Sequence, residues 1–171
     1  MISVRDTDNE ETQANYLLWT SLLKADKRIW AIAGGDGHAV CSDKALTTIY
    51  SKEKSTKGFL ESLRIGDFTC GGVGIRMAIN ETLMGGKCSF HKARLRICIG
   101  DFHRSVLIPE HVYRLDLLNE DGLVFSKEIS CTEPTYLAFN TAHCKFYRAE
   151  VFDVTRKTRI AIGNPIWNTD I

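Results

Sequence analysis

The stretch "RIWAIAGGDGHAV", residues 28–40, decides how the first part of the chain is interpreted. Its apolar run from Ile29 to Ala33 has no polar alternation, which is typical of a parallel strand buried on both faces of an α/β layer. Two glycines end the run, and the turn after them presents Asp36 and His38 as its polar side chains. Because functional groups of α/β folds gather at the carboxyl ends of such strands, this turn is a candidate site.

Helix and strand patterns surround that stretch. The segment "TQANYLLWTSLLKADKR", residues 12–28, has apolar residues at helical spacing, and "ALTTIYS", residues 45–51, is β-branched and predicts a strand. A second helix is expected in "STKGFLESLRIGD", with Ser55 or Thr56 as N-cap and Gly66 as its stop. Its expected core-facing residues are Phe59, Leu60, Leu63 and Ile65. The order helix, strand, strand, helix indicates the closing units of an α/β layer with too few strands to complete a sheet.

From about Phe68 the pattern changes to short strands separated by turns. In "ARLRICI", residues 93–99, Leu95, Ile97 and Ile99 alternate with polar positions, as in a strand with one wet face. Two hairpins follow, one turning at 119–122 and one with a polar tip at 155–158. We therefore predict an α+β fold: a partial α/β layer in residues 1–69, followed by an antiparallel β-sandwich in residues 70–171.

Composition limits the partners. The 171-residue chain is 44% hydrophobic, enough for one core or two small ones, and its formal net charge of +1 argues against nucleic acid or an anionic membrane as partner. Its six cysteines form no Cys-x-x-Cys pair, which argues against a zinc knuckle or a thioredoxin motif. A polar start and the lack of an apolar run of membrane length predict a cytoplasmic protein with reduced thiols.

The first part of the chain resembles the carboxyl-terminal portion of a polymerase-and-histidinol-phosphatase (PHP) domain, in particular its CehA/McbA-like metallohydrolase branch. Members of that branch carry a small-residue turn ending in Asp-x-His, here Asp36 and His38, and then a helix of the form Leu-x-x-Leu-x-x-Gly with an Arg-x-Gly near its end. The matching positions of that helix are Leu60, Leu63, Arg64 and Gly66. The ending "YRAEVFDVTRKTRIAIGNPIWN" resembles the last strands of the β-rich extension in the same branch.

The resemblance implies a distorted β/α barrel that binds a cluster of divalent metals and hydrolyses small phosphoesters. By position, Asp36 and His38 would be metal ligands, and a carboxylate oxygen with an imidazole nitrogen suits zinc, manganese or iron. PHP domains open with His-x-His on their first strand, and this sequence contains no such motif. Two ligands do not hold a catalytic metal cluster, so the divalent metal is expected in the complete enzyme, and this chain alone should be inactive.

Two classes of function remain open. The chain is either the carboxyl-terminal part of a PHP-type phosphoesterase-like hydrolase, or a non-catalytic β-sandwich interaction or assembly module with a vestigial PHP remnant. An α/β part with so few strands would leave sheet edges open, so we also expect a homo-oligomer.

Several other residues have simpler interpretations. The second Asp-x-His, Asp101 to His103, follows an alternating strand and is interpreted as a solvated turn. Packing in the core is the expected role of the aromatic residues Trp19, Trp30, Phe59 and Phe68. Trp167 is expected to anchor the end of the chain.

Overall fold

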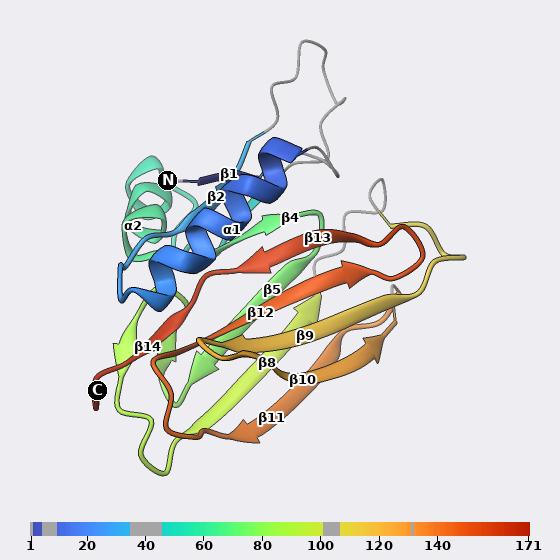
Figure 1. Cartoon of the computed structure of the whole chain (residues 1–171). Coiled ribbons are helices and arrows are strands. Elements are labelled where there is room, and N and C mark those ends of the chain that lie inside the picture. Colours follow the sequence, from blue (N-terminus) through green and yellow to red (C-terminus); the bar gives the residue numbers. More distant parts are fainter. Residues whose placement is uncertain (1, 5–9, 35–45, 101–106, 131) are drawn as a thin grey trace.

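The computed structural model describes residues 2–4, 10–34, 46–100, 107–130 and 132–171 (Figure 1). Its elements are β1 (Ile2–Val4), α1 (Glu10–Lys24), β2 (Ala31–Ala33), β3 (Thr47–Ile49), α2 (Thr56–Ile65), β4 (Phe68–Gly71), β5 (Gly74–Ile79), β6 (Thr82–Leu83), β7 (Lys87–Cys88), β8 (Arg94–Gly100), β9 (Tyr113–Asn119), β10 (Gly122–Ile129), β11 (Thr135–Asn140), β12 (Phe146–Asp153), β13 (Thr158–Gly163) and β14 (Ile166–Asn168). Strands dominate, and two helices lie among these residues, so the α+β class is confirmed.

Two mainly antiparallel sheets build the sandwich-like part. The larger has the order β10-β9-β12-β13-β4-β3, with β14 and β7 attached beside β12, and the smaller has the order β11-β8-β5-β6. Leu95, Ile97 and Ile99 of β8 are buried as predicted, because alternate residues of the strand face the space between the sheets. The first predicted hairpin is β9–β10, and the second is β12–β13.

Strand β12 separates two hydrophobic cores. Its residues Tyr147, Ala149 and Val151 face the core between the sheets, which we call the sandwich core. Phe146, at the start of the strand, belongs instead to a second core beneath α1, which we call the helix-side core. Trp167 lies in the helix-side core at 1% exposure, with its ring centroid 5.1 Å from that of Trp30, so it anchors the end of the chain as expected. The result is a layered molecule, in which α1 crosses the outer face of the larger sheet (Figure 1).

The predicted parallel strand is present as β2, which pairs in parallel with β1 in a sheet of two strands. Ala31 and Ala33 of this strand are buried. Asn164, near the end of the chain, is hydrogen-bonded to this strand, since the Ala31 N–H donates to Asn164 Oδ1 at 2.9 Å. No barrel is formed by the described ranges, and the expected boundary between residues 69 and 70 falls within β4, a strand that pairs with both β3 and β13.

Helix α1 begins two residues before the predicted segment 12–28, ends four residues before its end, and buries one face. Tyr16, Trp19 and Leu23 recur at helical spacing in the helix-side core. The indole Nε1 of Trp19 donates to the carbonyl of Ile29 at 3.0 Å, which holds the return of the chain towards β2 against the helix. No helix in the described part of the chain is long and apolar enough to cross a bilayer.

Helix α2 has the predicted caps but not the predicted buried face. Ser55 is the N-cap, and its hydroxyl accepts from the Gly58 N–H at 3.0 Å. Gly66 ends the helix at φ 88°, a conformation that glycine adopts without strain. The expectation of a core-facing apolar stripe is wrong for three of its four members. Their exposed fractions are 43% for Phe59, 49% for Leu60 and 48% for Ile65.

The physical reason is that α2 packs through its polar side. Ser62 is buried, and its hydroxyl donates to the carbonyl of Tyr50 at 2.8 Å, just after β3. Leu63, the fourth member of the stripe, is partly buried against the helix-side core. Most of the apolar stripe, namely Phe59, Leu60 and Ile65, is therefore left about half exposed in the described structure.

Candidate functional site

The predicted ligands Asp36 and His38 lie outside the described residues, as do Asp101 and His103. What is described is the strand that leads to the first pair. The Thr47 hydroxyl donates to the Ala33 carbonyl at 2.6 Å, so β3 holds the end of β2. Within the described ranges, no group of three or more His, Cys, Asp or Glu side chains could hold a metal ion.

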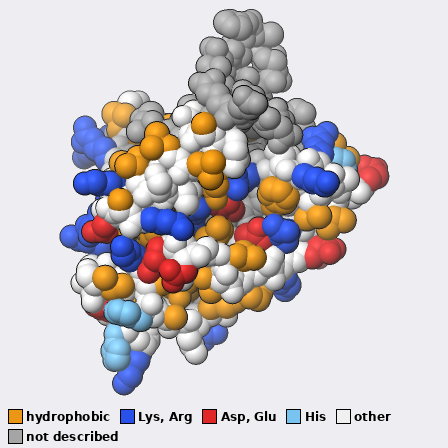
Figure 2. Space-filling view, in the orientation of Figure 1, with side chains coloured by type: hydrophobic (Ala, Val, Ile, Leu, Met, Phe, Trp, Pro, Cys, Tyr) orange, Lys and Arg blue, Asp and Glu red, His pale blue; other side chains and the backbone are white. Residues whose placement is uncertain are grey.

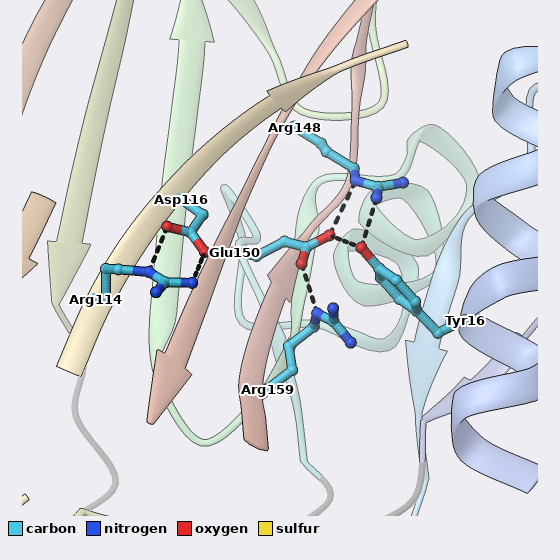
Figure 3. A network of polar contacts seen from close by, with 6 residues as sticks. All are labelled: Tyr16, Arg114, Asp116, Arg148, Glu150 and Arg159. Atoms are coloured by element: carbon cyan, nitrogen blue, oxygen red, sulfur yellow. Dashed lines mark hydrogen bonds and ion pairs between the residues drawn. The ribbon is translucent and has the colours of Figure 1, made fainter. Parts of the chain in front are cut away.

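A buried polar network joins α1 to the larger sheet (Figure 3). Glu150 of β12 is at its centre, and Tyr16 of α1 donates its hydroxyl proton to Glu150 Oε1 at 2.9 Å. Arg148 Nη2 donates to the Tyr16 hydroxyl oxygen at 2.7 Å, while Arg148 Nε lies 3.0 Å from Glu150 Oε1. From β13, Arg159 Nε donates to Glu150 Oε2 at 2.5 Å. The Glu150 carboxylate thus contacts two guanidinium groups and accepts a hydrogen bond from a phenol.

Burial and ring contacts make this network an attachment of the helix rather than an open site. Arg148 is 2% exposed and Glu150 is 4% exposed, so solvent hardly reaches either charge. The Arg148 guanidinium carbon lies 4.8 Å from the Trp19 ring centroid, and that of Arg159 lies 3.5 Å from the Tyr16 ring centroid. Burial, with the neighbouring Glu150 carboxylate, raises the pKa of Tyr16, so its hydroxyl keeps the proton that it donates.

A second ion pair lies beside the network on the same face of the sheet (Figure 3). Arg114 donates from Nε and Nη2 to the two oxygens of Asp116, both at 2.7 Å. Asp116 is directly opposite Glu150 in the β9–β12 register, so two like charges share one row of the sheet. Each carboxylate has its own guanidinium partner, which compensates for that repulsion.

An open cleft lies elsewhere, where α2, the segment after β3, and strand β5 meet. It consists of two adjoining hollows of about 500 Å³ and about 670 Å³, which share Asp67, Arg76 and Leu83. We call it the Asp67 cleft. The first hollow runs beside α2, and the second runs over the outer face of the smaller sheet, past Cys98 and Tyr136.

Electrostatics single out one group in this cleft. Asp67 is only 6% exposed, and burial raises the pKa of its carboxyl even though the positive charges of Arg76 and Lys52 lower it. The Arg76 guanidinium carbon lies 4.9 Å from the centroid of the Tyr50 ring. Sequence reasoning missed Asp67 because it follows the helix-ending Gly66 and there resembles an ordinary turn residue. A carboxylate placed directly before the short strand Phe68–Gly71, which is mostly buried, was the available signal.

Comparisons of the chain with protein-family models, with curated proteins and with solved structures found no match.

Proposed function

We propose that this chain is the carboxyl-terminal part of a PHP-type metal-dependent hydrolase, phosphoesterase-like and inactive by itself. The parallel pair β1–β2 supports this proposal best. Parallel sheets are normally built from several strands and covered on both faces, whereas this sheet has two strands in the described part of the chain. Its second strand ends at Ala33, shortly before Asp36 and His38 in the sequence.

Exposed apolar surface on both helices supports the same proposal. Leu17 and Leu18 of α1 are 56% and 54% exposed, and hydrophobic side chains lie on the surface over that helix (Figure 2). Phe59, Leu60 and Ile65 extend such surface over α2. Large exposed apolar side chains on two helices are typical of a surface that packs against further elements, and the remaining strands and helices of a barrel would cover them.

The donor set does not fit a catalytic metal centre held by this chain alone. Asp36 and His38 provide one carboxylate and one imidazole, and a catalytic zinc site uses three protein ligands. In the proposed complete enzyme they would be two ligands of a manganese, zinc or iron centre, and the remaining ligands would come from sequence outside this chain. The substrate would be a small phosphoester, and the location would be the cytoplasm.

The same exposed helix faces also favour a second candidate, a non-catalytic interaction or assembly module that self-associates. In that case the homo-oligomer should form through α1 and α2. Replacing Phe59 and Leu60 together by serine should then shift the light-scattering mass towards that of a monomer. A wild-type chain that is monodisperse and monomeric at micromolar concentration would contradict this candidate.

Two measurements test the hydrolase proposal. The DNA upstream of the Met1 codon should encode an in-frame segment with His-x-His, and a stop codon followed by a ribosome-binding site there would instead favour the module. Calorimetry should show weak zinc binding that is lost in Asp36→Ala and in His38→Ala but kept in His143→Ala, a control at an exposed histidine. Identical titrations for all four proteins would contradict the assignment of the ligands.

A third measurement tests the expected lack of activity. The purified chain with added manganese or zinc should hydrolyse bis(p-nitrophenyl) phosphate no faster than the metal alone. Turnover that a chelator abolishes would contradict the inference that this chain lacks a complete set of ligands.

A further inference from the structure

Asp67 is a buried residue whose carboxylate has no partner among the described residues. No hydrogen bond or ion pair from the described residues reaches its side chain. Two backbone hydrogen bonds hold the residue in place: the Asp67 N–H donates to the Ser62 carbonyl at 3.1 Å, and the Tyr50 N–H donates to the Asp67 carbonyl at 3.2 Å. Burying a carboxylate without a partner destabilises a fold. Because the backbone holds this side chain against both hollows of the Asp67 cleft, it is placed to meet a ligand.

Arg76 is the complementary group in the same cleft. It extends from β5, and its guanidinium lies over the Tyr50 ring, which restricts its position. None of its N–H groups has a hydrogen-bond acceptor among the described residues. Asp67 and Arg76 line the same two hollows, yet they form no ion pair with each other. The cleft therefore contains a carboxylate that can accept hydrogen bonds and a guanidinium that can donate them, and the two groups do not pair with each other.

We infer that the Asp67 cleft binds a small zwitterion, an organic molecule that carries an ammonium group for Asp67 and a carboxylate for Arg76 on an apolar body. The ammonium supplies the donors and the positive charge that the buried carboxylate lacks. The ligand carboxylate matches the planar fork of the guanidinium. Ile49, Ile65 and Leu83 line the first hollow and would pack against the apolar body.

The charges around the first hollow argue against a ligand of a single sign. Asp67, Glu53 and Glu61 are acidic, while Lys52 and Arg76 are basic. A plain anion such as inorganic phosphate would approach three carboxylates, and a plain amine would leave the guanidinium unpaired. This inference is independent of the hydrolase proposal, because it involves neither Asp36 nor His38.

The test uses the whole chain and two probes, L-leucine and 6-aminohexanoate, which separate the two charges by different lengths. By calorimetry, at least one of them should bind with a dissociation constant of about 1 mM or tighter. For the probe that binds, N-acetylation and conversion of the carboxylate to the amide should each weaken binding by about tenfold or more, since each removes one charge-assisted contact. Failure of both probes to bind, or equal binding of the blocked derivatives, would overturn the inference.

Three variants assign the contacts. Asp67→Asn and Arg76→Gln should each weaken binding of the probe by about tenfold or more, while Arg94→Gln, an exposed arginine of β8 outside the lining of the cleft, should bind as the wild type does. Asp67→Asn should also melt no lower than the wild type, because it removes a buried charge without changing shape. Unchanged binding in Asp67→Asn, or a lower melting temperature of that variant, would show that Asp67 has a structural role and would overturn the proposal.

Discussion

Replacing Glu150 by glutamine tests whether the buried network fastens α1 to the sandwich. The substitution keeps the shape of the side chain but removes the only carboxylate that contacts Arg148 and Arg159 among the described residues. The Arg148 guanidinium is 2% exposed and would be left as a buried charge without a counterion. Its Nη1 atom is buried without a hydrogen-bond partner in the described structure even in the wild type.

The expected cost is large compared with the stability of an ordinary domain. Breaking a buried ion pair by removing one partner costs about 3–5 kcal/mol of unfolding free energy. A domain of this size typically has about 5–15 kcal/mol in total. A matched control is Glu81→Gln, which breaks the pair with Arg96, whose side chains are 98% and 57% exposed, and should cost about 0–1 kcal/mol.

Urea denaturation followed by tryptophan fluorescence is the appropriate assay. All three tryptophans, Trp19, Trp30 and Trp167, lie in or against the helix-side core, so the signal reports on the layer that the network holds. A quadruple variant, Tyr16→Phe with Arg148→Met, Glu150→Leu and Arg159→Met, should recover most of the loss, because it leaves neither a buried charge of the network nor an orphaned phenol. A loss below about 1 kcal/mol in Glu150→Gln would refute the reasoning.

Three other substitutions have expected outcomes. The folded-state pKa of Asp67 is raised, so the wild type loses stability as the pH rises through that pKa. In thermal melts, Asp67→Asn should therefore be more stable than the wild type near neutral pH, and this gain should disappear at acidic pH. A difference that stays constant with pH would contradict this. Burial opposes ionisation of Asp153, but hydrogen bonds from His111 Nδ1 at 2.8 Å and from a backbone N–H lower the pKa of this carboxyl below its usual value. Ionised Asp153 therefore stabilises the fold above the unfolded-state pKa, and this stabilisation is lost as the pH falls through the folded-state pKa. Asp153→Asn should therefore be less stable at neutral pH and show a shallower acid decline in melting temperature, and parallel curves would argue against it. Gly66→Ala should lower the free energy of unfolding in urea by about 1–3 kcal/mol, because φ is 88° and the new Cβ would lie 2.9 Å from a backbone carbon. Gly34→Ala is the control: its Cβ would meet nothing within 4 Å, so it should change stability by less than about 0.5 kcal/mol.

Local patterns predicted most of the elements because their causes are local. The caps of α2 depend on Ser55 and Gly66, and the burial of β8 depends on alternation, so both could be derived from a few neighbouring residues. The buried side of α2 could not be predicted in this way, because amphipathicity identifies the apolar face of a helix but not whether the surface that covers that face lies in the same chain. For this reason Phe59 was predicted to be buried but is exposed in the structure.

The buried polar groups were hidden for a different reason. In β12, Arg148 and Glu150 alternate with apolar residues, which predicts a face in contact with water. Helix α1, more than a hundred residues away in sequence, covers that face through Tyr16. The Asp67 cleft likewise depends on α2, the segment after β3, and β5 meeting in space, a tertiary arrangement that no single window of sequence records.

The double-sided strand β12 also determines how the sheet can be aligned. A shift of one residue along β9 and β13 would turn Arg148 and Glu150 into the apolar space between the sheets and would place Tyr147, Ala149 and Val151 against the polar side of α1. Such a slipped pairing would bury two charges among aliphatic side chains, far from the phenol that they contact in the observed alignment. The ion cluster therefore marks the correct pairing of the strand during folding, whatever its net contribution to the stability of the finished structure.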